Sequence, residues 1–247
     1  YSVNDNVDKV FAHTRGGAGR IYGLSGGAFS QAVELQNAGV AQGYLAPDGS
    51  FVVFRTTPGV LRRGVTVAPA TNTDLSTTPV LTNLLLASKD LKYVVSSSKS
   101  DNANPDIPRF DLLFHGTAAA AAPTPAVATA IGYPLGFTDS GSHLAYLSDV
   151  PAQGVFANLK LHPTAGGADI QMGKDAFFFM PLGGNLFAYA DNGRDVGDDT
   201  VMDLKASNGG AGTPTLIVAG AVVGYEALGN KVFYAMAGDA LYSAEIK

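Results

Sequence analysis

Apolar and polar positions alternate over short segments of this chain, and six of these segments follow one pattern. In each, a turn residue is followed, after two intervening positions, by three residues that are mostly apolar or aromatic. The spacings between successive turn residues are 42, 42, 50, 43 and 45. Repeats of this length, built from short strand-like segments, are typical of a ring of small antiparallel sheets, the β-propeller. The turn residues are Val7, Gly49, Leu91, Gly141, Gly184 and Gly229.

Each repeat contains strand-like segments, which we call A to D from the centre of the predicted ring outward. Segment A precedes the turn residue, and segment B is the apolar triplet that follows it. Glycine at the turn supplies the positive φ that a tight hairpin needs. Val7 and Leu91 replace that glycine, so we expect a different turn in the first and third repeats. The segments of the second repeat are 40–45, 52–54, 65–67 and 80–81.

The pattern therefore predicts an all-β fold, a six-bladed β-propeller of four-stranded antiparallel blades. We expect one domain, because all-β units of 247 residues commonly stay single. The last repeat stops after segment C, and residues 1–3 can complete either the first blade or the sixth. Since an open ring leaves strand edges unpaired, we expect an incomplete or ragged closing blade. The repeats span 1–38, 39–82, 83–128, 129–173, 174–219 and 220–247.

Composition narrows the classes of partner and chemistry. Charged residues make up 15% of the chain and the net charge is -5, which argues against a nucleic-acid partner. The absence of cysteine excludes disulfides, thiolate zinc sites and a cysteine nucleophile. The longest apolar runs are far shorter than the ~20 residues of a membrane span, so we expect none. The chain begins at Tyr1 without a leader, so we expect a processed or excised piece of an exported bacterial protein, periplasmic or extracellular.

Two segments resemble repeats of the TolB-like (WD40-like) β-propeller family. In that family, Ser-Pro-Asp-Gly precedes an apolar strand, and an aspartate-bearing loop, a second strand and a Gly-Gly turn follow. Residues 137–149 (FTDSGSHLAYLSD) and 46–54 (APDGSFVVF) match this phrase, although the family's usual tryptophan is absent. The resemblance implies a propeller. It also implies binding to a protein partner or attachment to a larger parent chain, since members mostly bind proteins or accompany catalytic domains.

The loops that join segments B and C are the most polar parts of the chain. In a propeller these loops gather on one face, around the mouth of the central channel, where ligands commonly bind. We therefore interpret their charged side chains as candidate ligand- or partner-binding residues. These are Arg62, Arg63, Asp101, Asp106, Arg109, Asp149 and Arg194.

The most acidic of these loops, residues 191–199, is a candidate site for a structural calcium ion, and we expect no other cofactor. Calcium takes about six to eight oxygen ligands, which carboxylates and amides supply. The order of the residues is not that of an EF-hand, so a solvated acidic hairpin is the alternative. The candidate ligands are Asp191, Asn192, Asp195, Asp198 and Asp199. The four histidines form no metal-binding pair motif, and we expect them at the surface or at strand edges.

Three functions are compatible with these observations. We favour a non-catalytic binding or scaffold propeller that recognises a protein or another ligand through the loop face around the channel. The alternative is a calcium-dependent hydrolase or lyase with carboxylates at the channel mouth. A structural subunit of an extracellular assembly is the third. The sequence leaves open whether the protein is an enzyme, because propellers host catalysts, binders and scaffolds alike.

Overall fold

The computed structural model describes residues 1–14, 16–76, 84–101, 103–104, 106–119, 128–197, 199–209, 213–236 and 240–246. Every regular element in these ranges is a β-strand, as the all-β prediction requires. The strands are β1 (Ser2–Val3), β2 (Lys9–His13), β3 (Gly17–Ser25), β4 (Ala28–Leu45), β5 (Phe51–Thr56), β6 (Leu61–Val65), β7 (Asn72–Asp74), β8 (Leu84–Ala87), β9 (Tyr93–Asp101), β10 (Arg109–Gly116), β11 (Ala128–Phe137), β12 (His143–Ser148), β13 (Ala157–Pro163), β14 (Ile170–Ala176), β15 (Phe178–Gly183), β16 (Leu186–Val196), β17 (Asp199–Ser207), β18 (Thr215–Leu228), β19 (Lys231–Met236) and β20 (Ala240–Glu245).

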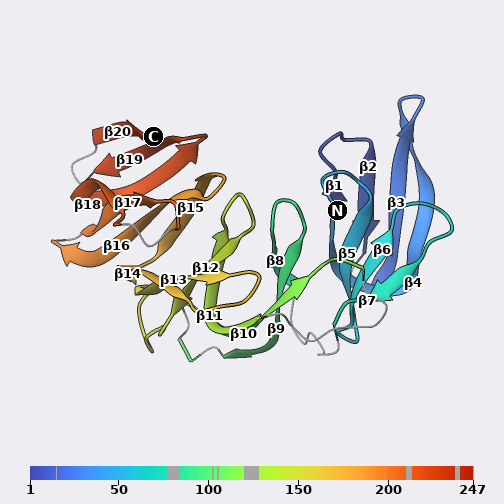
Figure 1. Cartoon of the computed structure of the whole chain (residues 1–247), viewed down its shortest axis with the longest axis horizontal. Coiled ribbons are helices and arrows are strands. Elements are labelled where there is room, and N and C mark those ends of the chain that lie inside the picture. Colours follow the sequence, from blue (N-terminus) through green and yellow to red (C-terminus); the bar gives the residue numbers. More distant parts are fainter. Residues whose placement is uncertain are drawn as a thin grey trace. The chain divides into compact units, whose positions relative to one another are not determined.

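The chain divides into two compact units. The first contains Tyr1–Ser100 and Asp111–Thr129, and the second contains Asp101–Phe110 and Ala130–Lys247. In the first unit, β1 to β7 form a seven-stranded sheet in chain order, and β8, β9 and β10 are hydrogen-bonded neighbours. In the second unit, β11 to β14 are neighbours in chain order, and β15 to β20 form a six-stranded sheet (Figure 1). Across the described residues, no sheet closes on itself.

Two long strands change their hydrogen-bonding partner along their length. β4 pairs with β3 through its first half and with β5 through its second half. Val40 takes part in both ladders, opposite Gly17 on one side and Thr56 on the other. β18 behaves in the same way between β17 and β19. In β4 and β18, the outer segment of one repeat and the inner segment of the next are therefore one continuous strand.

The strand predictions hold for segment B of every repeat but are wrong for part of the second repeat. The sequence pattern predicts segment C at 65–67, whereas β6 ends at Val65. The strand begins earlier because Leu61 and Gly64 are buried. β7 has no counterpart in the prediction, since its three residues are polar, and the segment predicted at 80–81 lies outside the described residues. β1 pairs with β2, so residues 2–3 complete the first repeat rather than the sixth.

The buried cores explain why segment B is apolar at consecutive positions. In β5, Val52 and Phe54 belong to one buried cluster, with Phe11, whereas Val53 belongs to another, with Leu91. Because successive side chains of a strand point to opposite faces, this strand is buried on both sides. The second unit contains corresponding clusters, one of which includes Phe187 and Tyr189 from β16. Neighbouring sheet segments therefore pack face to face within each unit.

All six turn residues have a positive φ, between 53° and 71°, including Val7 and Leu91. The first four turns share one hydrogen bond, from the turn residue N–H to the carbonyl three residues earlier. The expectation of a different turn in repeats one and three is therefore wrong. A side-chain bond closes three of these turns, with or without glycine. Asn4 Oδ1 accepts from Lys9 N at 2.9 Å, Ser88 Oγ accepts from Tyr93 N at 3.0 Å, and Thr138 Oγ1 accepts from His143 N at 3.2 Å.

We number the first five of these turns in chain order. Turn 1 spans residues 4–9, turn 2 spans 46–51 and turn 3 spans 88–93, all in the first unit. Turn 4 spans 138–143 and turn 5 spans 182–186, both in the second unit.

Candidate functional site

In three repeats, the hydroxyl of a buried threonine donates a hydrogen bond to the carbonyl of the turn residue. Thr66 Oγ1 donates to the Gly49 carbonyl at 2.5 Å, and Thr117 Oγ1 donates to the Leu91 carbonyl at 2.5 Å. Thr164 makes the same bond to Gly141 at 3.0 Å. Because these hydroxyls are at most 3% exposed, their bonds satisfy carbonyls that water does not reach. Their distance from the turn residue varies, at 17, 26 and 23 positions, so spacing from the turn does not predict these threonines.

Turns 1 and 2 are joined by direct hydrogen bonds, and we call this contact the closed seam. Lys9 Nζ donates to the Gly49 carbonyl at 2.9 Å and to Thr66 Oγ1 at 3.2 Å. Asp5 N donates to the Pro47 carbonyl at 2.9 Å. Lys9 therefore reaches across from turn 1 to the carbonyl and threonine of turn 2.

Turns 4 and 5 are also joined directly. Ser140 N donates to the Gly184 carbonyl at 2.8 Å. Ser142 Oγ donates to Asn185 Oδ1 at 2.9 Å, and Ser140 Oγ donates to the same oxygen. Hydroxyl and amide groups thus replace the lysine in the second unit.

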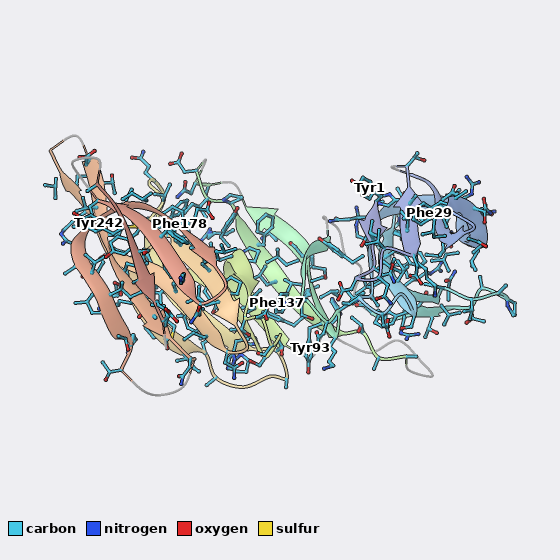
Figure 2. All side chains as sticks on the ribbon, turned by 90° about the horizontal axis from the view of Figure 1, so that it is seen from above. Tyr1, Phe29, Tyr93, Phe137, Phe178 and Tyr242 are labelled. Carbon is cyan, nitrogen blue, oxygen red and sulfur yellow. The ribbon has the colours of Figure 1, made fainter. Side chains whose placement is uncertain are left out.

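The space between turns 2 and 3 is open, and we call it the seam groove. Phe51 stands two residues after the turn residue, as Lys9 does in turn 1, but a phenyl ring cannot donate a hydrogen bond. The groove has a volume of about 530 Å³. One of its aromatic residues, Tyr93, begins β9 and is labelled in Figure 2. The lining residues are Asp48, Phe51, Arg63, Asp90, Lys92, Tyr93, Gly116, Thr117 and Ala118.

Arg63 lies over an aromatic wall of this groove. Its Cζ is 4.1 Å from the centroid of the Phe51 ring, a cation–π contact between diagonal positions of β5 and β6. Its Nε is buried, and burial lowers the pKa of the guanidinium, with a smaller opposing effect from Asp48. Among the described residues, no side chain or carbonyl forms a hydrogen bond or ion pair with the Arg63 guanidinium. An arginine remains protonated at neutral pH, so its charge is available to a ligand.

The other charged groups of the groove already have partners. Lys92 Nζ lies 2.9 Å from Asp90 Oδ2. Asp48 accepts from the backbone N–H of Ser50 at 2.9 Å and from its hydroxyl at 2.7 Å. Both bonds lower the pKa of Asp48, and the bond from the Ser50 backbone N–H has the larger effect. Among the charged residues that line the groove, Arg63 is therefore the one whose side chain has no hydrogen-bonded partner in the described part of the chain.

The structure corrects the position of the two predicted arginines. Arg62 and Arg63 lie in the middle of β6, not in a loop, and alternation places their side chains on opposite faces. Arg62 Nε lies 2.7 Å from Asp74 Oδ1, and its Nη1 donates to Gln36 Oε1 at 3.1 Å. Only Arg63 lines the seam groove.

The remaining predicted ligand-binding residues do not line the groove. Asp101 ends β9 and Arg109 begins β10, whereas Asp106 is exposed in the connection between these strands. Asp149 accepts from Asn158 and Ser148, and these hydrogen bonds lower its pKa. Arg194 donates to the Asn192 carbonyl at 2.8 Å. Asp149 and Arg194 therefore support their own turns and strands.

The acidic segment 191–199 is largely strand, because β16 continues to Val196. Asp191 is 3% exposed and its Oδ2 lies 2.7 Å from Lys205 Nζ, while burial raises its pKa. Asn192 donates to Asp203, Asp195 accepts from Thr200, and Asp199 begins β17. In the described ranges, no three His, Asp or Glu side chains are placed to hold a metal ion. Asp198 lies outside these ranges, and the calcium site stays a prediction.

Two histidines are buried, so the expectation of surface or edge positions is wrong for them. His115 is 2% exposed, its Nε2 lies 3.0 Å from Ser96 Oγ, and burial lowers its pKa to about 4. His162 Nδ1 lies 2.6 Å from Asp169 Oδ1, and the Tyr146 hydroxyl donates to the other oxygen of that carboxylate. Both histidines stand two residues before a buried threonine, in the sequences HGT and HPT.

No protein-family model matches the sequence, and a search of curated proteins returns no significant match. Solved structures do match. An oligogalacturonate lyase in complex with manganese has a TM-score of 0.59 at 12% identity, over 99% of this chain and 73% of the lyase. An oligogalacturonate lyase from Vibrio parahaemolyticus has a TM-score of 0.55 at 12% identity, with the same coverage of 99% and 73%. A eukaryotic initiation factor has a TM-score of 0.61 at 15% identity, over 96% of this chain and 59% of that protein.

At these identities the likeness shows the fold alone. The neighbours are propeller-type structures, so the antiparallel sheets of this chain form a fold of the β-propeller type. In the part of the chain that the structure describes, no helix is long and apolar enough to cross a membrane.

Proposed function

We propose that this protein is a non-catalytic, ligand-binding β-propeller that binds its ligand in the seam groove. The observation that carries the proposal is the Arg63 guanidinium, held against Phe51 in an open groove and without a hydrogen-bonded partner among the described residues. Ligand sites typically combine aromatic walls with a few placed polar groups, and this groove has that composition. A partly buried polar group that lacks a partner is destabilising unless a ligand supplies one.

The wider proposal is a six-bladed ring with four-stranded blades and a three-stranded last blade, similar to TolB-like propellers. The six positive-φ turn residues and the partner exchange within β4 and β18 support it. Sequence alone supports an exported bacterial location and a partner that is a protein or a larger parent chain.

The second candidate is a metal-dependent lyase or hydrolase. The likeness to an oligogalacturonate lyase determined with manganese, at a TM-score of 0.59, is the reason to test it. The reaction would use the carboxylates of segment 191–199, including Asp195.

A groove-filling substitution tests the binding function. A Cβ at Gly116 meets no atom within 4 Å, so Gly116→Phe fills the groove without a backbone clash. We expect ligands selected from an unbiased peptide library to bind the Gly116→Phe variant at least about tenfold more weakly than the wild type. The matched control is Gly23→Phe on β3, where a Cβ would meet only the Ala32 methyl at 3.9 Å.

Two results would overturn the proposal. One is undiminished binding of the selected peptides to Gly116→Phe. The other is turnover of oligogalacturonate in the presence of calcium or manganese that is lost in Asp195→Asn, which would establish the second candidate. A wild-type melting temperature that rises on adding calcium would point the same way, because a ligand of the folded state alone stabilises it.

A further inference from the structure

We propose that the seam groove recognises a single carboxylate carried on an apolar or aromatic body, such as the C-terminal residue of a peptide. This inference rests on the proposed binding function and adds the chemistry of the ligand. It follows from the one charged lining group that lacks a partner among the described residues, from the walls beside it and from the acidic groups at the rim.

Arg63 sets the requirement for a carboxylate. The face of its guanidinium lies on Phe51, so the N–H donors at the edges of the plane remain to be satisfied. A planar carboxylate can accept two parallel N–H bonds from such a fork and neutralise its charge at the same time.

The walls select what carries the carboxylate. Phe51, Tyr93, Gly116 and Ala118 present aromatic and small apolar surface. Ser88 Oγ donates to Asp90, which also pairs with Lys92. Most polar groups of the groove are therefore committed to one another, and few remain for the many hydroxyls of an oligosaccharide. An apolar body loses no hydrogen bonds on entering such a site.

The rim limits the number of charges on the ligand. Asp48 and Asp90 line the groove together with Arg63 and Lys92, so the four formal charges cancel. A ligand with one carboxylate meets Arg63, whereas a polyanion also meets the two aspartates, which repel it. A volume of about 530 Å³ suits a ligand of one to a few residues.

The test compares an acid with its amide. We expect N-acetylphenylalanine to bind the wild-type protein by isothermal titration calorimetry, and N-acetylphenylalanine amide to bind at least about tenfold more weakly. Arg63→Gln should weaken binding of the acid by a similar factor and leave binding of the amide unchanged. Arg63→Lys should recover only part of the loss, since lysine cannot present the planar fork.

Arg62→Gln is the matched control, because its side chain faces away from the groove and pairs with Asp74. It should bind the acid as the wild type does. Circular dichroism checks that each variant folds. If Arg63→Gln does not fold, the acid and amide compared on the wild-type protein still decide the result.

Equal binding of the acid and the amide would overturn the inference, as would unchanged binding by folded Arg63→Gln. Stronger Arg63-dependent binding of digalacturonate would also overturn it, because the carboxylate would then be recognised on a sugar. Failure here differs from failure of the proposed function. Peptides that lack a carboxylate yet are displaced by Gly116→Phe would retain the groove as a binding site and remove its carboxylate specificity.

Discussion

The closed seam between turns 1 and 2 and the seam groove between turns 2 and 3 have the same backbone framework in the same unit. Each has a turn residue with positive φ and a buried threonine that donates to that residue's carbonyl. They differ at the position two residues after the preceding turn residue. Lys9 reaches across the closed seam to a carbonyl, whereas Phe51 stays on its own sheet beneath Arg63.

The difference shows how a repeat protein can form an open groove, here a candidate binding site, without a new loop. A lysine satisfies the acceptors of the next turn and fills the space above them. A phenylalanine leaves that space open and provides a flat surface for an arginine. The candidate site is therefore a position where one repeat departs from its neighbour.

The largest expected effect is on the pH dependence of stability, and it comes from His115 in β10, the strand beside the seam groove. His115 has a pKa of about 4 in the folded protein, against 6.5 for an unperturbed histidine. Above pH 6.5, His115 is neutral in both the folded and the unfolded protein, so it does not change the free energy of unfolding. As the pH falls from 6.5 to 4, His115 takes up a proton in the unfolded protein only. The free energy of unfolding should therefore fall by about 3 kcal/mol over that window, in excess of any change in His115→Gln.

Urea unfolding of the wild type and His115→Gln at pH 7.5, 5.5 and 4.5 measures this excess. Parallel loss of stability in both proteins would show that His115 is protonated in the folded state. The acid sensitivity of the strand next to the groove would then be no different from that of the rest of the first unit.

The buried threonines should differ in strength between the two seams. Thr66 serves both the Gly49 carbonyl and Lys9, whereas Thr117 serves the Leu91 carbonyl. We expect Thr66→Val to lower the free energy of unfolding by about 2 kcal/mol and Thr117→Val by about 1 kcal/mol. Denaturant unfolding gives both values, and Lys9→Met combined with Thr66→Val gives the coupling between the two side chains. Equal losses would mean that the hydrogen bond from Lys9 to Thr66 adds nothing to stability.

The smallest effect concerns the turn residue of the closed seam. Val7 has a φ of 57° and is 59% exposed, so the side chain strains the backbone and gains little from burial. Val7→Gly should stabilise the protein by about 0.5 kcal/mol, the relief of strain less the greater freedom of glycine in the unfolded chain. Val67→Gly, at a similarly exposed valine that lacks a positive φ, should destabilise it slightly. A loss of melting temperature in Val7→Gly would contradict the assignment of strain to this turn.

The pattern of apolar triplets predicts the strands well because segment B is buried on both faces and must be apolar at consecutive positions. The same pattern locates the six turn residues, because each of these positions has a positive φ whatever the residue. β7 escapes prediction because its three residues are polar and pair with β6 through backbone bonds and the Arg62–Asp74 ion pair, which leave no apolar alternation in the sequence.

The candidate site is only partly predictable. Charge alone marks Arg63 as a candidate binding residue, but its predicted place in a loop is wrong because the alternation of Leu61, Arg63 and Val65 begins four residues before the predicted strand. Whether a groove is open depends on whether a side chain of one turn reaches the next turn. Those turns are far apart in sequence, 42 residues from Val7 to Gly49 and 42 from Gly49 to Leu91. No local pattern records that a phenylalanine stands where a lysine would close the gap.

The exchange of partners within β4 constrains how this protein tolerates change in chain length. Val40 belongs to two ladders at once and no loop separates them. Removing Gly43 from the regularly paired stretch that follows would therefore turn every later side chain of the strand to the opposite face. Among related sequences, we therefore expect insertions and deletions in hairpin connections such as Gly26 and Gly27, and few in the part of β4 where its partner changes from β3 to β5.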